Sequence, residues 1–407
     1  MAGLAVPSVV DVGTVADAAL AAGAGTCHCV HMQSPLSVVV APDSFKGTIA
    51  AAPAAAALAQ GWREVRPDDV VRLLPLADGG EGTLDAFESA VPGAVRHELS
   101  VPGPDGRPVT ASWLLLPGAV AVVELAAASG LGLLTRPQPY DAHTRGLGRL
   151  VAAALDAGAR RVLVALGGSA STDGGAGMLT ELGARLLDSL GEPVVDGAHG
   201  LAAASRLDLS GLRALPVDGV VGLTDVRSPL LGPRGSAAVF GPQKGAGPDD
   251  VLALEAALAS FASLVDVDPA TPGAGAAGGT GFGLLLWGAV LESGAEAVAE
   301  AVDARSFVET ADVVVTGEGR YDAQTAEGKV VAWVCSEAAR AGVRTALVAG
   351  SVATETGSFD AVVELAGLAG GAAESSARPE PWLREAGREL ARRETALREG
   401  DASAPVD

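Results

Sequence analysis

The sequence predicts an α/β fold whose sheets are largely parallel and flanked by helices. From residue 37 onward, short runs of Val and Leu alternate with longer alanine-rich segments, which is the pattern of strand–helix repeats. Apolar residues make up 49% of the chain but aromatic residues only 3%, so the core must be built from Ala, Val and Leu. The 54 glycines predict many tight turns. A length of 407 residues is enough for two or three domains.

The individual elements follow from this pattern. Apolar runs predict strands over 37–41, 70–74, 120–124, 161–166, 219–223, 312–316 and 344–349. Alanine-rich segments predict helices over 49–64, 82–90, 145–157, 175–188, 249–265, 283–302, 328–341 and 380–398. The Pro/Gly-rich segment 93–117 predicts a hairpin with a turn at Pro104-Asp105-Gly106, and it places the start of a second domain near residue 92. The charged segment from residue 371 predicts a surface helix with a frayed end.

The charge and cysteine content exclude several classes of protein. A net charge of −21 argues against a nucleic-acid partner or an anionic membrane, because both need clustered Lys and Arg. Three cysteines are too few for a disulfide framework and fit a reducing cytoplasm. The longest uncharged stretch, Pro269–Leu291, is too rich in glycine for a good membrane span, and the N-terminus lacks a basic region typical of a secretory signal. We therefore expect a cytoplasmic protein, as a monomer or a homodimer.

Residues 1–35 differ from the rest of the chain, and we expect an extension without stable structure there. The segment is rich in small residues and contains no convincing strand. Its Cys27-His28-Cys29-x-His31 run is a poor metal site, since adjacent ligands cannot easily surround one tetrahedral ion. Met32, just before the first strand, suggests the alternative that translation starts later than Met1.

Five glycine-containing loops follow or connect the predicted strands. They read DSFKG (43–47), LADGGEGT (76–83), LGGSASTDGGAGM (166–178), LTDVRSPLLGPRGSAAVFGPQKGAG (223–247) and VVVTGEGRYDAQTAEGK (313–329). Each loop alone could be an ordinary turn or a helix cap. Loops at the carboxyl ends of parallel strands, however, meet at one crevice, and glycine turns expose N–H groups that bind anions. Together the loops predict a shared binding site.

The charged residues of these loops favour phosphoryl transfer. The cations are Lys46, Lys244, Arg320 and Lys329, and the carboxylates are Asp78, Glu81, Asp173, Asp225, Glu318 and Asp322. Phosphoryl transfer needs cations and N–H groups over the phosphates, carboxylates for Mg²⁺, and one carboxylate as proton acceptor. Magnesium takes only one or two protein carboxylates, so not all six acids can be ligands. The first loop lacks the upstream glycine of a Walker loop, and no complete dinucleotide fingerprint supports a nicotinamide-dependent reductase.

Taken together, the loops resemble those of the glycerate kinase family, of the type found in glucarate and glyoxylate utilisation. APDSFKG, LADGGEGT, LGGSASTDGGAGM, GPQKGA and TGEGRYDAQTAEGK occur in that family's order, and the resemblance covers about residues 37–370. It implies Mg²⁺-assisted, ATP-dependent phosphorylation of D-glycerate to 2-phosphoglycerate. It also implies two α/β domains with the active site in the cleft between them. The domains would be a discontinuous Rossmann-like one over 36–91 and 290–370, an inserted one with a mixed sheet over 92–289, and a charged helix and tail over 371–407.

The resemblance also leads to expected roles for the loop residues. We expect Lys46, Asp78 and Asp173 to be catalytic, with Lys46 facing a phosphate or the glycerate carboxylate and Asp173 preferred to Asp78 as the base. The residues expected to bind substrate or phosphate are Asp43, Ser44, Gly79, Gly80, Glu81, Gly167, Gly168, Ser169, Lys244, Gly317, Gly319, Arg320 and Lys329. Those expected to bind the metal are Asp225, Glu318 and Asp322. Replacing Lys46 or Asp173 by Ala should lower turnover by orders of magnitude with little change in thermal midpoint.

This chain departs from the family pattern at three places. Thr172 stands where the family commonly has Asn before the aspartate of the third loop, and Val330 stands where it often has Pro after Gly328-Lys329. In the fourth loop the family often has Asp-Val-x-Asn-Pro, and this chain has Asp225-Val226-Arg227-Ser228-Pro229. Arg227 adds a cation near the expected substrate and leaves the fine specificity open. The alternatives are therefore a kinase for another small hydroxy acid and a nucleotide-binding regulator that has lost catalysis.

Overall fold

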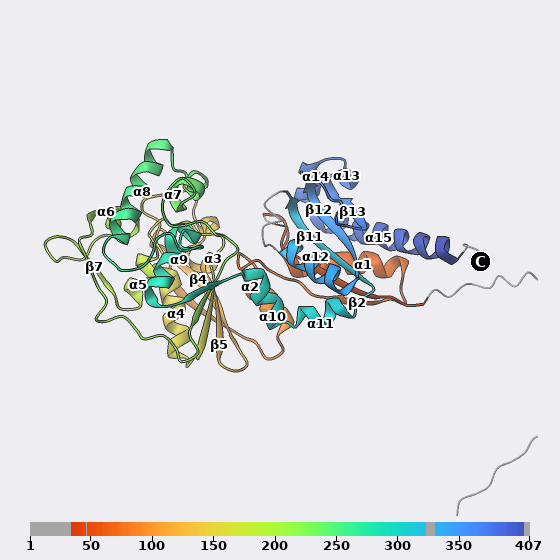
Figure 1. The fold of residues 1–407 in the computed structure, drawn as a ribbon, viewed down its shortest axis with the longest axis horizontal. Coiled ribbons are helices and arrows are strands. Elements are labelled where there is room, and N and C mark those ends of the chain that lie inside the picture. The colour runs from red at the N-terminus through yellow and green to blue at the C-terminus, as the bar shows by residue number, and fades with distance from the viewer. Residues whose placement is uncertain (1–33, 46, 323–329, 403–407) are drawn as a thin grey trace, which may run out of the picture. The chain divides into compact units, whose positions relative to one another are not determined.

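The computed structural model describes residues 34–45, 47–322 and 330–402, which contain two main sheets (Figure 1). The predicted N-terminal extension falls outside the described residues except for its last two positions. Lys46 and Lys329 fall outside them as well.

The first sheet is entirely parallel and uses strands from both ends of the chain. Its five strands, in spatial order, are β13 (Ala361–Glu364), β12 (Arg344–Val352), β11 (Val313–Tyr321), β1 (Ser37–Pro42) and β2 (Val70–Leu73). Four of them match predicted strands. The edge strand β13 was not predicted.

The second sheet is mixed and comes from the middle of the chain. Its six strands, in spatial order, are β10 (Val290–Glu292), β9 (Val220–Leu223), β6 (Arg161–Ala165), β5 (Val120–Glu124), β4 (Pro108–Leu116) and β3 (Val95–Pro102). Strands β3, β4 and β5 pair antiparallel and the others pair parallel. The predicted hairpin over 93–117 is confirmed as β3 and β4, and a two-stranded sheet of β7 (Arg185–Leu187) and β8 (Arg206–Asp208) is separate. The predicted α/β class with largely parallel sheets is thus confirmed, whereas the domain boundaries stay a prediction.

Helices lie between these strands along the chain. The longer ones are α1 (Ala51–Val65), α2 (Thr83–Ala90), α4 (Arg145–Asp156), α8 (Pro248–Ala262), α9 (Ala276–Trp287), α10 (Gly294–Ala301), α12 (Val330–Ala341) and α15 (Pro379–Ala402). The shorter ones include α3 (Leu125–Ser129), α5 (Ala176–Glu181), α6 (Gly197–Ala203), α7 (Ser236–Phe240), α11 (Ala304–Glu309), α13 (Leu365–Ala369) and α14 (Ala372–Ala377).

One predicted helix, over 283–302, is wrong. Helix α9 ends at Trp287 because Gly288 adopts a left-handed conformation with φ of 99°, which is a common way for a helix to stop. Strand β10 follows, and α10 begins after Ser293, whose hydroxyl accepts a hydrogen bond from the Glu296 N–H. The Leu- and Ala-rich sequence on both sides of the break concealed it.

The predicted helix over 175–188 is also too long. Helix α5 ends at Glu181, Gly183 has φ of 107°, and β7 begins at Arg185. Both errors have the same cause: a glycine with positive φ ends the helix, and the sequence pattern alone does not reveal the sign of φ.

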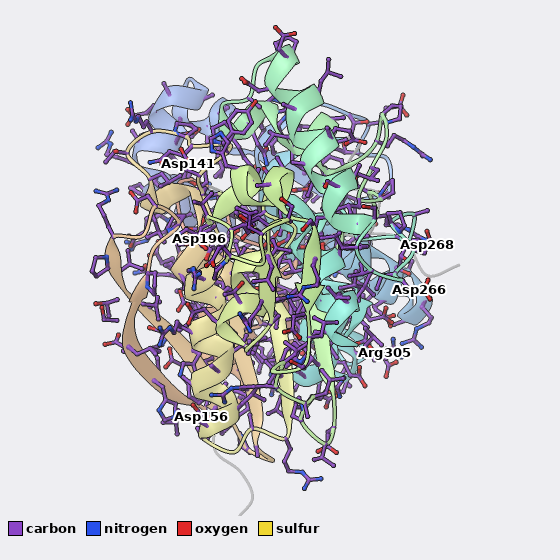
Figure 2. The ribbon with its side chains drawn as sticks, turned by 90° about the vertical axis from the view of Figure 1, so that its left-hand side faces the viewer. Asp141, Asp156, Asp196, Asp266, Asp268 and Arg305 are labelled. Carbon is purple, nitrogen blue, oxygen red and sulfur yellow. The ribbon has the colours of Figure 1, made fainter. Side chains whose placement is uncertain are left out.

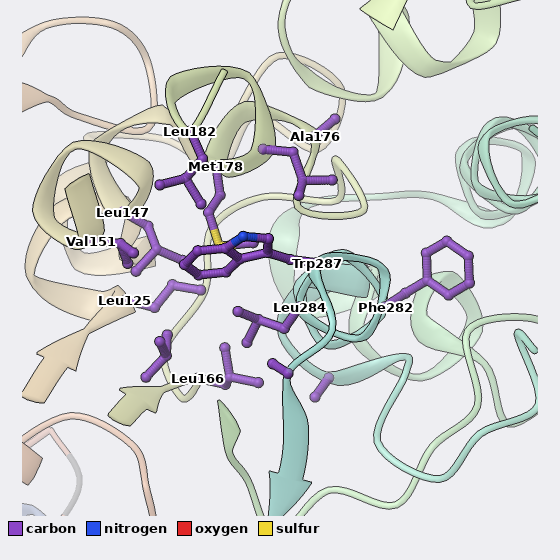
Figure 3. Packing of buried hydrophobic residues seen from close by; sticks show 14 of the residues in the cluster. Leu125, Leu147, Val151, Leu166, Ala176, Met178, Leu182, Phe282, Leu284 and Trp287 are labelled. Carbon is purple, nitrogen blue, oxygen red and sulfur yellow. The ribbon is translucent and has the colours of Figure 1, made fainter. Parts of the chain in front are cut away.

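The buried side chains form one core on each main sheet and a third cluster that joins them. Figure 3 shows part of the core of the second sheet, where Trp287 of α9 lies among Met178, Leu147 and other aliphatic residues. In the first sheet, α1 and α15 cover one face, with Trp62 fully enclosed. The third cluster contains residues of both sheets and of α2, α10 and α12. Both sheets therefore belong to one packed unit, which extends from Pro35.

Candidate active site

Two adjoining cavities lie at the carboxyl ends of the strands. The larger has a volume of about 610 Å³ and is lined by parts of the first three glycine-containing loops, including Ser44, Gly80, Glu81, Gly167 and Gly168. The smaller has a volume of about 270 Å³ and is lined by parts of the first and fifth loops. Ser44, Phe45 and Thr48 line both cavities, so the first loop forms their common wall.

The smaller cavity is lined by most of the expected residues of the first and fifth loops that the structure describes, although not by Gly317 of β11. Those that line it are Asp43, Ser44, Glu318, Gly319, Arg320 and Asp322. The Asp43 backbone N–H donates to the Gly317 carbonyl at 2.8 Å, which fixes the end of β1 against β11. Arg320 is exposed and its Nε lies 3.3 Å from an Asp322 carboxylate oxygen, whereas Glu318 is buried. One cation and several acids at one strand end suit an anionic ligand that is bound together with a metal cation such as Mg²⁺.

The second and third loops cross at the larger cavity with almost no space between their backbones. The Gly167 N–H donates to the Gly79 carbonyl at 3.0 Å, and a Cβ atom on Gly167 would lie 2.3 Å from the Gly80 Cα atom. Gly79 also has φ of 81°, which side-chain-bearing residues rarely adopt. Asp78 accepts the Gly80 N–H at 3.1 Å, so it shapes this turn. The crossing requires glycine on both loops.

Glu124 is a cavity residue that sequence reasoning missed. It is the last residue of β5, its side chain is 6% exposed, and it lines the larger cavity. Its Oε2 accepts the Leu84 N–H at 3.2 Å, at the start of α2. Burial, with a smaller contribution from the nearby carboxylates of Asp85 and Glu81, raises the pKa of Glu124 to about 7, although the hydrogen bonds from Leu84 and Gly82 act in the opposite direction. A lone acid ending the apolar run VAVVE was the available signal, because strand carboxyl ends are where ligands bind.

Asp173, the expected base, is fully buried and saturated with hydrogen bonds. Its carboxylate accepts from the Thr144 N–H at 2.8 Å, the Thr144 hydroxyl at 2.7 Å, and the N–H groups of Gly175 and Gly177 at 3.2 Å each. These bonds tie the start of α4 to the start of α5. Asp173 lines neither cavity, so the geometry suits positioning of the third loop.

Lys244 is also buried, with 2% of its surface exposed, and it lines neither cavity. Its ammonium group donates to the Ser171 carbonyl and lies 3.5 Å from the Ser169 hydroxyl. Burial lowers the pKa of Lys244 to about 7, while the charge of Asp173 acts in the opposite direction. Lys244 therefore holds the third loop in place at Ser169 and Ser171. Gly168, the residue before Ser169, lines the larger cavity.

Asp225 lies near Asp78 rather than beside Glu318 and Asp322. Its Oδ1 accepts from the Ser293 hydroxyl at 2.8 Å and the Gly294 N–H at 3.0 Å. Its Oδ2 is buried without a hydrogen-bond partner among the described residues. Burial raises the pKa of Asp225 to about 6, and the charge of Asp78 contributes to the increase. A buried carboxylate oxygen next to a second carboxylate is a donor set that a hard cation such as Mg²⁺ would satisfy.

The expected metal ligands are thus divided between two places. Within the described part of the chain, no three His, Cys, Asp or Glu side chains form a metal-binding group. Magnesium does not need such a group, because it is commonly bound by one or two carboxylates together with substrate phosphates.

The described ranges also contain no helix that is both long and apolar enough to cross a membrane.

Comparison with known proteins identifies the family. Residues 38–394 match the model of the glycerate kinase family. The chain is 43% identical to a glycerate kinase of Bacillus subtilis over 79% of its own length and 86% of that protein's. It is 40% identical to a glycerate 2-kinase of Escherichia coli K12, over 79% and 87% of the two lengths.

A solved structure agrees with these relatives. The crystal structure of a candidate glycerate kinase 2 from Salmonella typhimurium LT2 superimposes with a TM-score of 0.76 at 37% identity, covering 90% of this chain and all of that one. The predicted resemblance and the predicted class of enzyme, a kinase, are confirmed. The chain belongs to the glycerate kinase family.

Proposed function

We propose that this protein transfers the γ-phosphoryl group of ATP to the 2-hydroxyl group of D-glycerate and releases 2-phosphoglycerate. The observation that carries the proposal is the convergence of three glycine-containing loops on the 610 Å³ cavity in a chain of this family. That volume lies within the usual range for small-molecule and cofactor sites. The name of the Escherichia coli relative supports transfer to the 2-hydroxyl group.

The residues have separate roles in the proposed reaction. The N–H groups of the turn at Gly168 would bind phosphate oxygens, and Arg320 and Lys46 would neutralise phosphate or carboxylate charge. The roles of Lys46 and Lys329 as cations that bind phosphate or carboxylate rest on the sequence alone, since both residues lie outside the described ranges. Asp173 and Lys244 would position the third loop without contacting substrate.

Magnesium fits two groups of carboxylates. Asp225 and Asp78 would hold it at the edge of the second loop, or Glu318 and Asp322 would hold it in the smaller cavity. When bound, the ion would neutralise the charge that develops on the transferred phosphoryl group. Replacing Asp225 or Glu318 by Asn or Gln and measuring the Mg²⁺ concentration for half-maximal activity separates the two groups.

Phosphorus NMR of the products tests the function directly. Incubation with ATP, Mg²⁺ and D-glycerate should yield ADP and the resonance of 2-phosphoglycerate, which differs from that of the 3-phosphate. A panel of other small hydroxy acids tests the alternative substrates, and Arg227→Asn tests whether that added cation affects the choice. ATP binding measured by calorimetry without turnover of any hydroxy acid would contradict the proposal and favour a nucleotide-binding regulator.

The cytoplasmic location and the oligomeric state, a monomer or a homodimer, stay predictions.

A further inference from the structure

We infer that Glu124 is the group that accepts the proton of the acceptor hydroxyl during phosphoryl transfer. The inference rests on the proposed function and adds a catalytic residue to it. Neither the sequence motifs nor the expected base, Asp173, pointed to this position.

The carboxylate of Glu124 is fixed in place and faces the larger cavity. Leu84 N–H donates to its Oε2 at 3.2 Å, and the backbone of Gly82 contributes a second bond. A carboxylate can accept about four hydrogen bonds, so two remain for a ligand. The same cavity wall carries Gly167 and Gly168 and the first loop with Ser44. Glu124 is therefore held beside the groups that are proposed to bind phosphate.

The other carboxylates are less suitable as proton acceptors. Asp173 is fully buried, accepts four hydrogen bonds and lines neither cavity. Of the acids that line the larger cavity, Asp85 accepts the Arg96 guanidinium at 2.7 Å and Glu81 is exposed to solvent. An exposed carboxylate binds a proton too weakly to be an efficient general base near neutral pH. Glu124 is the buried one of the three.

The proposed step balances without any further reactant. The hydroxyl oxygen of the acceptor forms a bond to the γ-phosphorus of ATP, and the bond from that phosphorus to the bridging oxygen breaks. The electron pair of the broken bond leaves with ADP, and the hydroxyl proton moves to Glu124. Glu124 then releases the proton to solvent through the cavity.

The charged surroundings of Glu124 suit a base that works near neutral pH. The charged groups that line the cavity with it, in the described residues, are Glu81 on the second loop, Asp85 on α2 and Arg96 on β3. Arg96 is already paired with Asp85 and Glu88. Burial and the two acids keep the pKa of Glu124 at about 7, which is where a general base is most effective.

The test compares Glu124→Gln with the wild type and with a control, Glu98→Gln. A glutamine keeps an oxygen that can accept the Leu84 N–H, so α2 stays capped while the base is lost. Glu98 is an exposed glutamate of β3 in the same sheet and has no role in the proposed site. We expect kcat with D-glycerate and ATP to fall by about 10²- to 10⁴-fold in Glu124→Gln and to stay unchanged in Glu98→Gln. Calorimetric affinities for ATP and D-glycerate should change little in both variants.

The pH profile separates a base from a structural residue. The wild-type kcat/KM should fall below a pH of about 7, and this acid limb should disappear in Glu124→Gln. Glu124→Asp, which keeps the carboxylate but shortens the side chain, should recover part of kcat. A Glu124→Gln enzyme with nearly normal kcat, or with a raised KM and unchanged kcat, would overturn the inference alone. A wild-type enzyme that produces no phosphoglycerate would overturn the proposed function, and this inference with it.

Discussion

At the residue scale, Glu124 should make stability depend on pH. Its pKa in the folded protein, about 7, is above the ordinary value of 4.5 for a glutamate, so folding favours the protonated form. The stabilisation is complete below a pH of about 4.5 and is lost as the pH rises through about 7. The difference corresponds to roughly 3 kcal/mol at high pH. We expect Glu124→Gln, which carries no charge, to raise the thermal midpoint relative to the wild type at pH ~8.5 and to raise it much less at pH ~4.5. Calorimetric scans at both pH values check this, and an equal increase at both would contradict the assigned pKa.

Asp173 should affect stability as well as turnover. The sequence alone led us to expect an intact thermal midpoint in Asp173→Ala. The structure leads to a different expectation, because that variant leaves the buried donors of Thr144, Gly175 and Gly177 without their acceptor. Each buried donor left unpaired costs about 1–3 kcal/mol. We therefore expect a clear fall in the free energy of unfolding, measured by urea denaturation.

Asp188→Ala is the matched control for Asp173. Asp188 also accepts two backbone N–H groups, from Leu190 and Glu192, but on an exposed turn where water can replace the carboxylate. The control should lose much less stability. Similar losses in the two variants would show that burial of the donors is not the cause.

At the element scale, the crossing of the second and third loops should tolerate no side chain. In Gly167→Ala the added Cβ would lie 2.3 Å from the Gly80 Cα atom, so one of the two loops must move. Because both loops line the larger cavity, we expect kcat/KM to fall by about 10-fold or more, together with a loss of stability of about 1–3 kcal/mol. Gly132→Ala is the control, since a Cβ there has nothing within 4 Å. Steady-state kinetics on both variants would decide, and normal activity in Gly167→Ala would contradict a rigid crossing.

The sequence pattern predicted the strands well and the ends of the helices poorly. The buried strands β1, β6 and β11 were found because runs of Val and Leu allow few other structures. Strand β10 was hidden because its three residues lie between two segments rich in Leu and Ala, and the left-handed turn at Gly288 that ends α9 depends on the fold.

The loops of the candidate site were also found from sequence, because glycine, cations and acids occur together in them. Which acids face the cavity was not. The sequence cannot tell a carboxylate bound by four buried donors, such as Asp173, from one that faces open space, such as Glu124. The burial of a charged loop side chain, and the direction in which it points, are set by tertiary packing. The periodicity of apolar residues along the chain does not reveal either of them.

At the scale of the whole molecule, exposed acids occur at more than one place on the surface. Figure 2 shows Asp141 and Asp156 apart from each other and from the neighbouring pair Asp266 and Asp268, and all four are exposed. A net charge of −21 favours solubility through the mutual repulsion of like charges.

The two ends of the described chain are joined by the packing of α1 against α15, and this contact should be sensitive to a single methyl group. Gly387 of α15 lies so close to α1 that a Cβ would be 2.1 Å from the Leu58 carbonyl oxygen. Exchange of Gly for Ala inside a helix normally stabilises by up to about 1 kcal/mol, but here the two helices must separate, so we expect Gly387→Ala to lose about 1–3 kcal/mol. Gly367→Ala in α13, where a Cβ has nothing within 4 Å, should be neutral or stabilising. Urea denaturation gives both values, and equal behaviour of the two variants would mean that α15 can shift on α1 without cost.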